Sequence, residues 1–116
     1  MTLREVAELL QAEVITGEEQ LDEKFEFAGA SDMMSDVLAF GETGILLLTG
    51  LANTQSVRTA EIVEAKAIVY VRGKKPRKEG IALAREKKIP ILSTKFLMYK
   101  ACGLLFGRGI PGVGDL

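Results

Sequence analysis

Apolar and polar positions alternate in short blocks along the chain, and the second half is the most regular. Apolar runs begin at Ile45, Ala67 and Ile89, at intervals of 22 residues, and helix-like segments separate them. Uniformly apolar runs of this length are typical of strands buried on both faces of a parallel sheet. The pattern predicts a single three-layer α/β domain, with a mainly parallel central sheet flanked by helices.

The first half of the chain is expected to add a helix and two short strands. Thr2 and Glu5 have the spacing of a capping box at the start of a helix over residues 2–11. The segments "EVITG" and "FEFAGA" read as strands, and a second helix follows them. Its predicted N-cap is Ser31 or Asp32. Its predicted apolar face consists of Met34, Val37 and Leu38, with Ala30 as a further candidate.

Three further helices follow the regular strands. The first is predicted over residues 55–66 with Asn53 or Thr54 as its cap, and the second begins after Pro76. The third is predicted to be capped by Ser93 or Thr94 and to run through "KFLMYKACGLL". We divide the chain into an α/β domain over residues 1–105 and a glycine-rich tail over residues 106–116, expected to be loose or docked on a neighbouring molecule.

Composition excludes the commonest catalytic and metal sites. The chain has no histidine and one cysteine, which rules out a Ser-His-Asp triad, a Cys-His pair and a thiolate metal cage. Cys102 is interpreted as a small buried apolar residue. Asp32 and Asp36 lie four residues apart, but helix capping and solvation account for them without a metal. We therefore expect no catalytic residue, no metal and no cofactor.

Hydropathy and cysteine usage bear on location. No apolar run reaches the roughly 18 residues that a membrane span needs, and the N-terminus does not read as a signal peptide. A single cysteine suits a reducing compartment. The sequence therefore predicts a cytoplasmic protein without a membrane partner.

Charge is divided unevenly along the chain. Residues 1–65 carry a balance of −10 and residues 66–116 a balance of +9, while the whole chain has a net charge of −1. The favoured interpretation is that the two halves neutralise each other within one fold. The alternatives are a basic face that binds an anion, or charged faces that meet between subunits.

Small, polar and basic residues follow every predicted parallel strand. The carboxyl ends of such strands lie along one edge of the sheet, where open α/β folds bind ligands at a reversal of strand order. Helix N-termini at this edge attract anions. The candidate ligand-binding residues are Ser31, Asp32, Thr49, Gly50, Asn53, Thr54, Arg72, Gly73, Lys74, Lys75, Ser93, Thr94 and Lys95.

The competing interpretation is that these segments are only solvated turns. Turns need glycine, hydroxyls and charges for purely structural reasons. No nucleotide-binding fingerprint of the G-x-x-x-x-G-K-[ST] or G-x-G-x-x-G type is present. The isoelectric point of about 5.5 disfavours a nucleic-acid partner.

The same strand ends carry a family resemblance. The segments "GASDMMSDVLAF", "LLLTGLANTQ", "AIVYVRGKKP" and "IPILSTKF" resemble the DRTGG domain family, which occurs alone, beside CBS domains and in some phosphate acetyltransferases. The family is similar in structure to the N-terminal domain of HPr kinase. Here Asp32 is followed by Met33 in place of arginine, and Thr49-Gly50 is followed by Leu51 in place of a second glycine.

The resemblance implies a non-catalytic regulatory or ligand-sensing module with an α/β fold, paired as a homodimer. Together with the strand ends, it predicts a small phosphorylated or nucleotide-like ligand. The alternative is an accessory domain or subunit of an enzyme complex, with an enzyme or signalling protein as its partner. Apolar residues in "FLMYKACGLLFGRGIPGV" exceed what one short helix can bury, which independently predicts self-association.

Overall fold

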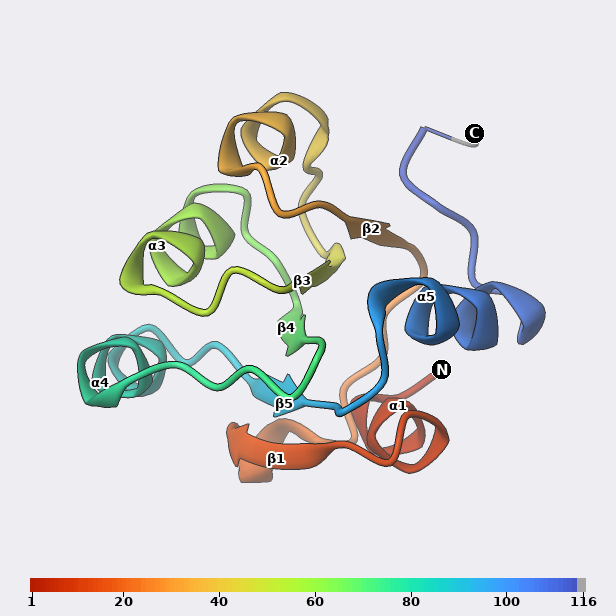
Figure 1. The fold of residues 1–116 in the computed structure, drawn as a ribbon, viewed down its shortest axis with the longest axis horizontal. Coiled ribbons are helices and arrows are strands. Elements are labelled where there is room, and N and C mark those ends of the chain that lie inside the picture. The colour runs from red at the N-terminus through yellow and green to blue at the C-terminus, as the bar shows by residue number, and fades with distance from the viewer. Residues whose placement is uncertain (115–116) are drawn as a thin grey trace.

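The computed structural model describes residues 1–114, and its five strands form one sheet in the order β1-β5-β4-β3-β2 (Figure 1). Strands β2 to β5 are parallel to one another, and β1 pairs with β5 in the antiparallel sense. The strands are β1 (Glu13–Thr16), β2 (Ala28–Ala30), β3 (Leu46–Thr49), β4 (Ala67–Tyr70) and β5 (Ile91–Ser93). The predicted α/β architecture with a mainly parallel sheet is confirmed.

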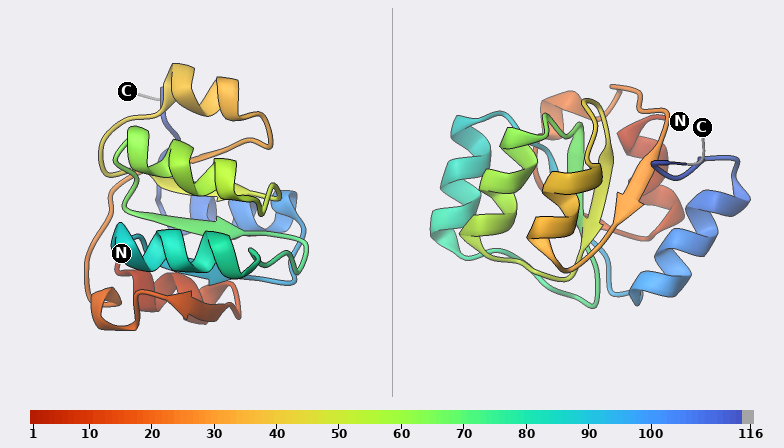
Figure 2. Two further views of the ribbon diagram at one scale, coloured as in Figure 1. Left: turned by 90° about the vertical axis from the view of Figure 1, so that its left-hand side faces the viewer. Right: turned by 90° about the horizontal axis from the view of Figure 1, so that it is seen from above.

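Helices cover the two faces of the sheet unequally. Three helices lie on one face: α2 (Met34–Phe40), α3 (Thr54–Ile62) and α4 (Lys78–Glu86). Two helices lie on the other face, α1 (Leu3–Leu9) and α5 (Met98–Gly107), as Figures 1 and 2 show. A short 3-10 turn, η1 (Glu18–Gln20), follows β1.

The unequal cover follows from the winding of the chain. From β2 to β5 each strand lies beside the previous one, so right-handed crossovers place all three connecting helices on the same face. The order of these parallel strands never reverses. The expectation of a ligand crevice at a reversal of strand order is therefore wrong for the described part of the chain.

The core is formed by the central strands. The three predicted buried strand segments are confirmed, because residues 45–48, 67–71 and 89–92 are all buried. Along β4, Val69 packs with α1 and α5, whereas Ile68 and Tyr70 pack with the three-helix face. The Tyr70 hydroxyl lies 2.7 Å from the Ser56 hydroxyl inside this second cluster. Two cores, one on each face, hold the sheet between them.

Two helix caps agree with the sequence. Thr2 and Glu5 form the predicted capping box on α1. The Asn53 side chain caps α3 by accepting from the amide of Ser56 at 2.9 Å. Both caps join residues three positions apart.

Two other predicted caps are wrong. The N-cap of α2 is Met33, and neither Ser31 nor Asp32 caps this helix. On the predicted apolar face of α2, Met34 and Val37 are buried but Leu38 is 49% exposed. A helix of seven residues buries only a narrow stripe.

The last helix also begins later than predicted. Its N-cap is Leu97, and neither Ser93 nor Thr94 caps it. The Thr94 hydroxyl donates to the carbonyl of Leu10 at 2.6 Å and accepts from the amide of Phe96 at 3.2 Å. These bonds hold residues 94–96 in a turn, so the helix starts only at Met98.

The second predicted strand is shorter than its apolar pattern, and the tail covers its edge. Only Ala28–Ala30 of "FEFAGA" is a strand. The Ala28 amide donates to the Pro111 carbonyl at 3.0 Å, and the Val113 amide donates to the Ala28 carbonyl at 2.8 Å. Through Val113, the tail is therefore docked on its own sheet, contrary to a loose tail or one docked on a neighbour. Residues 115 and 116 lie outside the described residues.

Ion pairs connect the acidic and basic halves of the chain. Five of them join a carboxylate before residue 66 to a cation after residue 65. They are Lys66–Glu23, Arg72–Asp32, Lys75–Glu13, Arg85–Glu18 and Lys87–Glu61. The opposite charges of the two halves thus meet within one fold, as the favoured interpretation holds.

We predict that Val69→Asp destabilises the protein by at least about 3 kcal/mol, because it places an unpaired charge in the core. Val69 is fully buried. The control is Leu97→Asp, at a residue that is 64% exposed and caps α5 without a side-chain bond. Aspartate is a good N-cap, so the free energy of unfolding of the control should equal that of the wild type or exceed it by up to about 1 kcal/mol. Equal stability of the two variants in urea denaturation would contradict the strand assignment.

We predict that stability falls above about pH 10 in a manner that depends on Tyr70. Burial raises the pKa of Tyr70 above its ordinary value of 10.0, against a smaller lowering by the bond to Ser56. The contribution of this raised pKa to stability is fully present below the pKa that Tyr70 has in the unfolded state. It is lost as the pH rises from that value through the higher pKa of Tyr70 in the folded state. Urea denaturation at about pH 8 and about pH 11 should show a smaller loss for Tyr70→Phe than for the wild type. An equal loss would contradict this role of Tyr70.

Candidate functional site

A polar pocket lies at the carboxyl edge of the sheet, between the loops that follow β3 and β4. Its volume is about 690 Å³. We call it the edge pocket, and its lining residues are Gly50, Leu51, Ala52, Asn53, Thr54, Arg72, Lys74, Lys75, Arg77 and Glu79. The pocket is thus built by two adjacent crossovers on the three-helix face.

Two helices begin at the edge pocket. Helix α3 starts at Thr54, and helix α4 starts at Lys78 with Arg77 as its N-cap. Asn53 caps α3, whereas no side chain caps α4. The first amides of a helix carry partial positive charge, so both starts favour a negatively charged group in this pocket.

The four basic residues of the edge pocket differ in whether their side chains already form ion pairs or hydrogen bonds. Lys75 forms an ion pair with Glu13 at 3.1 Å. Arg72 donates to the carbonyl of Gly50 at 3.2 Å. Within residues 1–114, the side chains of Lys74 and Arg77 form no hydrogen bond or ion pair, so their charges remain available. The carboxylate of Glu79 also lines the pocket and opposes them.

An aspartate ties three strand ends together beside this pocket. Asp32 accepts from the amide of Gly50 at 2.6 Å and from the hydroxyl of Thr49 at 3.3 Å, and its carboxylate lies 3.8 Å from the Arg72 guanidinium. We call this group of four residues the Asp32 clasp. It joins the ends of β2, β3 and β4.

Glycine at position 50 lets the flexible end of the Arg72 side chain lie against the backbone. A Cβ atom there would collide with the Arg72 guanidinium, which lies across the glycine. Arg72 itself adopts a left-handed backbone conformation with φ of 61°. Its amide donates to the carbonyl of Phe96 at 2.9 Å, which fixes this turn.

Six of the thirteen predicted site residues line the edge pocket: Gly50, Asn53, Thr54, Arg72, Lys74 and Lys75. The other seven do not line it. Asp32 and Thr49 belong to the clasp, and Ser31 accepts from the amide of Met33 at 3.0 Å. Ser93 and Thr94 are buried, and their hydroxyls donate to the carbonyls of Lys74 and Leu10. Gly73 and Lys95 are exposed outside the pocket.

Sequence reasoning missed four residues of this pocket, which are Leu51, Ala52, Arg77 and Glu79. Arg77 belongs to the same basic segment as Lys74, so the run of charges beyond Pro76 was an available signal. Glu79 is brought to the pocket by the first turn of α4. Its position depends on where that helix begins.

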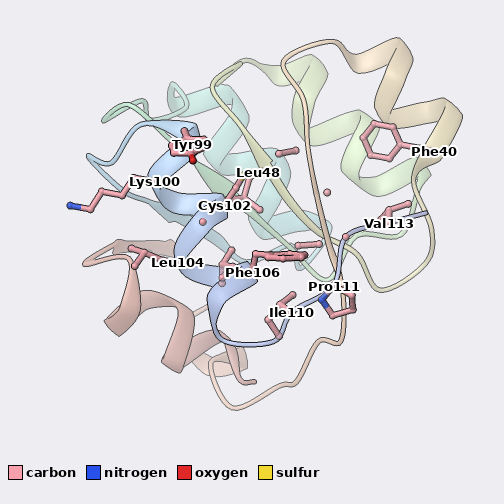
Figure 3. A pocket seen from close by; sticks show the side chains of 16 residues that line it. Phe40, Leu48, Tyr99, Lys100, Cys102, Leu104, Phe106, Ile110, Pro111 and Val113 are labelled. Atoms are coloured by element: carbon pink, nitrogen blue, oxygen red, sulfur yellow. The ribbon is translucent and has the colours of Figure 1, made fainter. Parts of the chain in front are cut away.

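A second, apolar cavity lies on the two-helix face, between α5, β2 and the docked tail (Figure 3). Its volume is about 820 Å³. We call it the α5 groove, and its lining residues are Ala28, Gly29, Ala30, Phe40, Leu48, Tyr99, Lys100, Cys102, Gly103, Leu104, Leu105, Phe106, Ile110, Pro111, Gly112 and Val113. The surplus of apolar residues after residue 95 was the only sequence signal for it.

The groove contains the one cysteine of the chain. Burial raises the pKa of the Cys102 thiol, which keeps it protonated and weakens it as a nucleophile. Across residues 1–114, no group of three or more carboxylate or thiol side chains is placed to hold a metal ion. Over the same residues, no helix has the length and apolar character to cross a membrane.

Comparison with known proteins identifies relatives of the chain. The family model of the DRTGG domain matches residues 5–105. No curated protein matches the sequence. The fold is similar to a crystal structure of the CBS and DRTGG domains of the regulatory region of Clostridium perfringens pyrophosphatase, complexed with the activator diadenosine tetraphosphate. The TM-score is 0.74 at 20% identity, over 90% of this chain and 45% of that one. This chain thus spans less than half of that chain.

The residues that carry the resemblance have a structural explanation. Asp32, Thr49 and Gly50 are the positions that match the family signature, and all three belong to the Asp32 clasp. Their shared task in this chain is to hold strand ends together beside the edge pocket.

We predict that Asp32→Ala lowers the free energy of unfolding by about 1–2 kcal/mol, because the buried amide of Gly50 loses its acceptor. Asp36→Ala is the matched control, since Asp36 is an exposed residue in the first turn of α2. Its loss should stay within about 0.5 kcal/mol. Urea denaturation measures both variants, and equal losses would show that the clasp does not stabilise the fold.

Proposed function

Because the chain belongs to the DRTGG domain family, we propose that it is a non-catalytic regulatory module that binds a small phosphorylated or nucleotide-like anion in the edge pocket. One observation carries the proposal. Lys74 and Arg77, whose side chains form no hydrogen bond or ion pair within residues 1–114, line the same pocket as the starts of α3 and α4. Fixed positive charge and free helix amides are the chemistry that recognises phosphate groups.

The residues of the pocket would divide the work of binding. Lys74 and Arg77 neutralise the charge of the ligand, and the Asn53-Thr54 segment offers a side-chain amide, a hydroxyl and backbone amides. Arg72 contributes through its field, because the Asp32 clasp already holds its guanidinium. An anion that reaches Arg72 must compete with the Asp32 carboxylate, so the clasp limits how far a ligand enters.

The comparison structure supports a regulatory role. That regulatory region of a pyrophosphatase was crystallised with diadenosine tetraphosphate as an activator. A nucleotide of this class combines phosphate charge with an uncharged base. We extend to this chain only the class of ligand, a phosphorylated small molecule, and place it in the edge pocket on the residues described above.

A second candidate function is that of an accessory domain or subunit of an enzyme complex. The observation that favours it is that the similar chain is about twice as long and contains CBS domains as well. In that case the chain acts on an enzyme or signalling protein through contacts, with or without a ligand. We propose in both cases that it works in the cytoplasm as a homodimer, which its single cysteine and the exposed apolar residues of α5 support.

We predict that a phosphorylated metabolite or nucleotide stabilises the protein in a thermal-shift screen. At about 100 times its Kd, one bound ligand adds about 2.7 kcal/mol, which raises Tm by several degrees in a domain of this size. Lys74→Ala/Arg77→Ala should abolish the shift. The control Lys24→Ala/Arg108→Ala removes the same charge outside the pocket and should keep it.

Any of three outcomes would overturn the proposal. If no nucleotide, sugar phosphate or inorganic phosphate stabilises the wild type, the edge pocket does not bind anions and the loops that line it are only solvated turns. If Lys74→Ala/Arg77→Ala responds like the wild type, the anion binds elsewhere. A shift that both double variants lose would indicate general charge screening.

A further inference from the structure

The two-helix face leaves part of the sheet uncovered. The other face carries a helix for each crossover, whereas α1 and α5 leave the sheet open beside β2 (Figure 1). Ala28 and Ala30 of β2 and Leu48 of β3 line the α5 groove at this place. The small side chains of Ala28 and Ala30 leave a depression that no helix of residues 1–114 fills.

A ridge of exposed aromatic residues lies directly beside this depression. On α5, Tyr99 is 92% exposed and Phe106 is 67% exposed. Gly103 lies between them at helical spacing, and a Cβ atom there would meet no other atom within 4 Å. Tyr99, Gly103 and Phe106 follow the i, i+4, i+7 face of one helix. The ridge therefore presents two rings with a gap between them.

We propose that a second copy of this chain occupies the α5 groove, so that α5 of each copy packs over β2 of the other. The inference rests on the homodimer of the proposed function and names its surface. A two-fold axis brings the same patch of both subunits together, so the patch must be self-complementary. Here a ridge and a groove lie side by side on one surface, and each can receive the other.

The shape of the surface favours a protein copy over a small apolar molecule. Tyr99 and Phe106 line the groove but are 92% and 67% exposed, so a small molecule inside it would leave most of their surface in water, whereas a partner helix would cover them. Ligand pockets also hold a few convergent polar groups that orient the ligand. In the α5 groove, Tyr99, Lys100 and Cys102 are the only lining residues with polar side chains, and Tyr99 and Lys100 are exposed at the rim.

The partner must contact this surface through side chains, because the backbone edge of β2 is already paired. The tail already pairs with the outer edge of β2 through Ala28, Pro111 and Val113. A partner strand therefore cannot extend the sheet there without displacing the tail. Packing a helix onto the open face needs no such change, and it completes a three-helix layer on this side of the sheet as well.

Gly103 gives the sharpest test of this geometry. Gly103→Arg improves helix propensity, and its Cβ atom would meet no neighbouring atom of the monomer within 4 Å, but the side chain would block the close approach of a second helix. Phe106→Glu places a charge on the ridge. The matched control is Ile62→Glu, at a residue that is 66% exposed on α3 of the opposite face.

The experiment is sedimentation of each protein in a dilution series from about 1 µM to ~100 µM, because a dimer with a Kd of about 1 µM is mostly associated at the upper concentration and half dissociated at the lower one. We expect twice the chain mass of 12.6 kDa for the wild type and for Ile62→Glu. Gly103→Arg and Phe106→Glu should each raise Kd by about tenfold or more. A monomeric wild type overturns the proposal. A dimer that neither α5 variant weakens, or that Ile62→Glu weakens as much, also overturns it.

Alkylation of Cys102 provides a second readout on the groove itself. Because Cys102 lines the groove, its alkylation should slow as wild-type concentration rises, and it should not slow for Gly103→Arg. If an apolar small molecule protects Cys102 in a monomeric wild type, the groove is a ligand pocket and the proposal fails. The anion response tests the edge pocket separately, because Phe106→Glu should keep the thermal shift whether or not the dimer forms.

Discussion

The burial of the central strands on both faces is the constraint on which the rest of the structure depends. Strands β3 and β4 are completely buried, and their only polar side chains are Thr49 and Tyr70, which lie at the carboxyl ends of the two strands. Polar chemistry is therefore confined to the strand ends. Since all parallel strands end at one edge, the anion pocket and the Asp32 clasp are crowded into the same place.

That crowding gives the carboxyl edge two opposing electrostatic roles. The Asp32 carboxylate occupies the amide of Gly50 and lies close to Arg72, so it acts as an anion that the protein itself supplies. Lys74 and Arg77, whose charges are not paired within residues 1–114, lie in the loop between β4 and α4. A motif that reads as a binding signature from sequence thus serves first to hold the strand ends, and binding is left to its neighbours.

The fold was predictable from sequence where the decisive contacts are local. The capping box of Thr2 and the cap from Asn53 each join residues three positions apart, and the sequence predicts both. The caps predicted at Asp32 and Thr94 fail because contacts with distant residues hold both side chains away from the helix starts, and the Thr94 oxygen accepts instead from the amide of Phe96. Asp32 accepts from Gly50, and Thr94 donates to Leu10, 84 positions away.

The candidate site was predictable to a similar degree and for the same reason. Parallel strands with basic ends place Lys74 near the start of α3, and this placement needs only the order of elements. The distinction between an engaged Arg72 and a free Lys74 depends on the left-handed turn at Arg72 and its contact with Asp32. The α5 groove depends on which face each helix covers, and no local pattern contains that information.

The docked tail also determines how the sheet ends. At the β2 edge the outermost pairing is a single bridge between Ala28 and Gly112, next to Pro111. At the opposite edge β1 is only four residues long, with an irregular register between Val14 and Thr16. Neither edge offers the long, regular strand with which a strand of another molecule could pair. When chains crowd together, the fold therefore resists edge-to-edge growth into fibrils, and contact between copies is left to reversible packing of side chains.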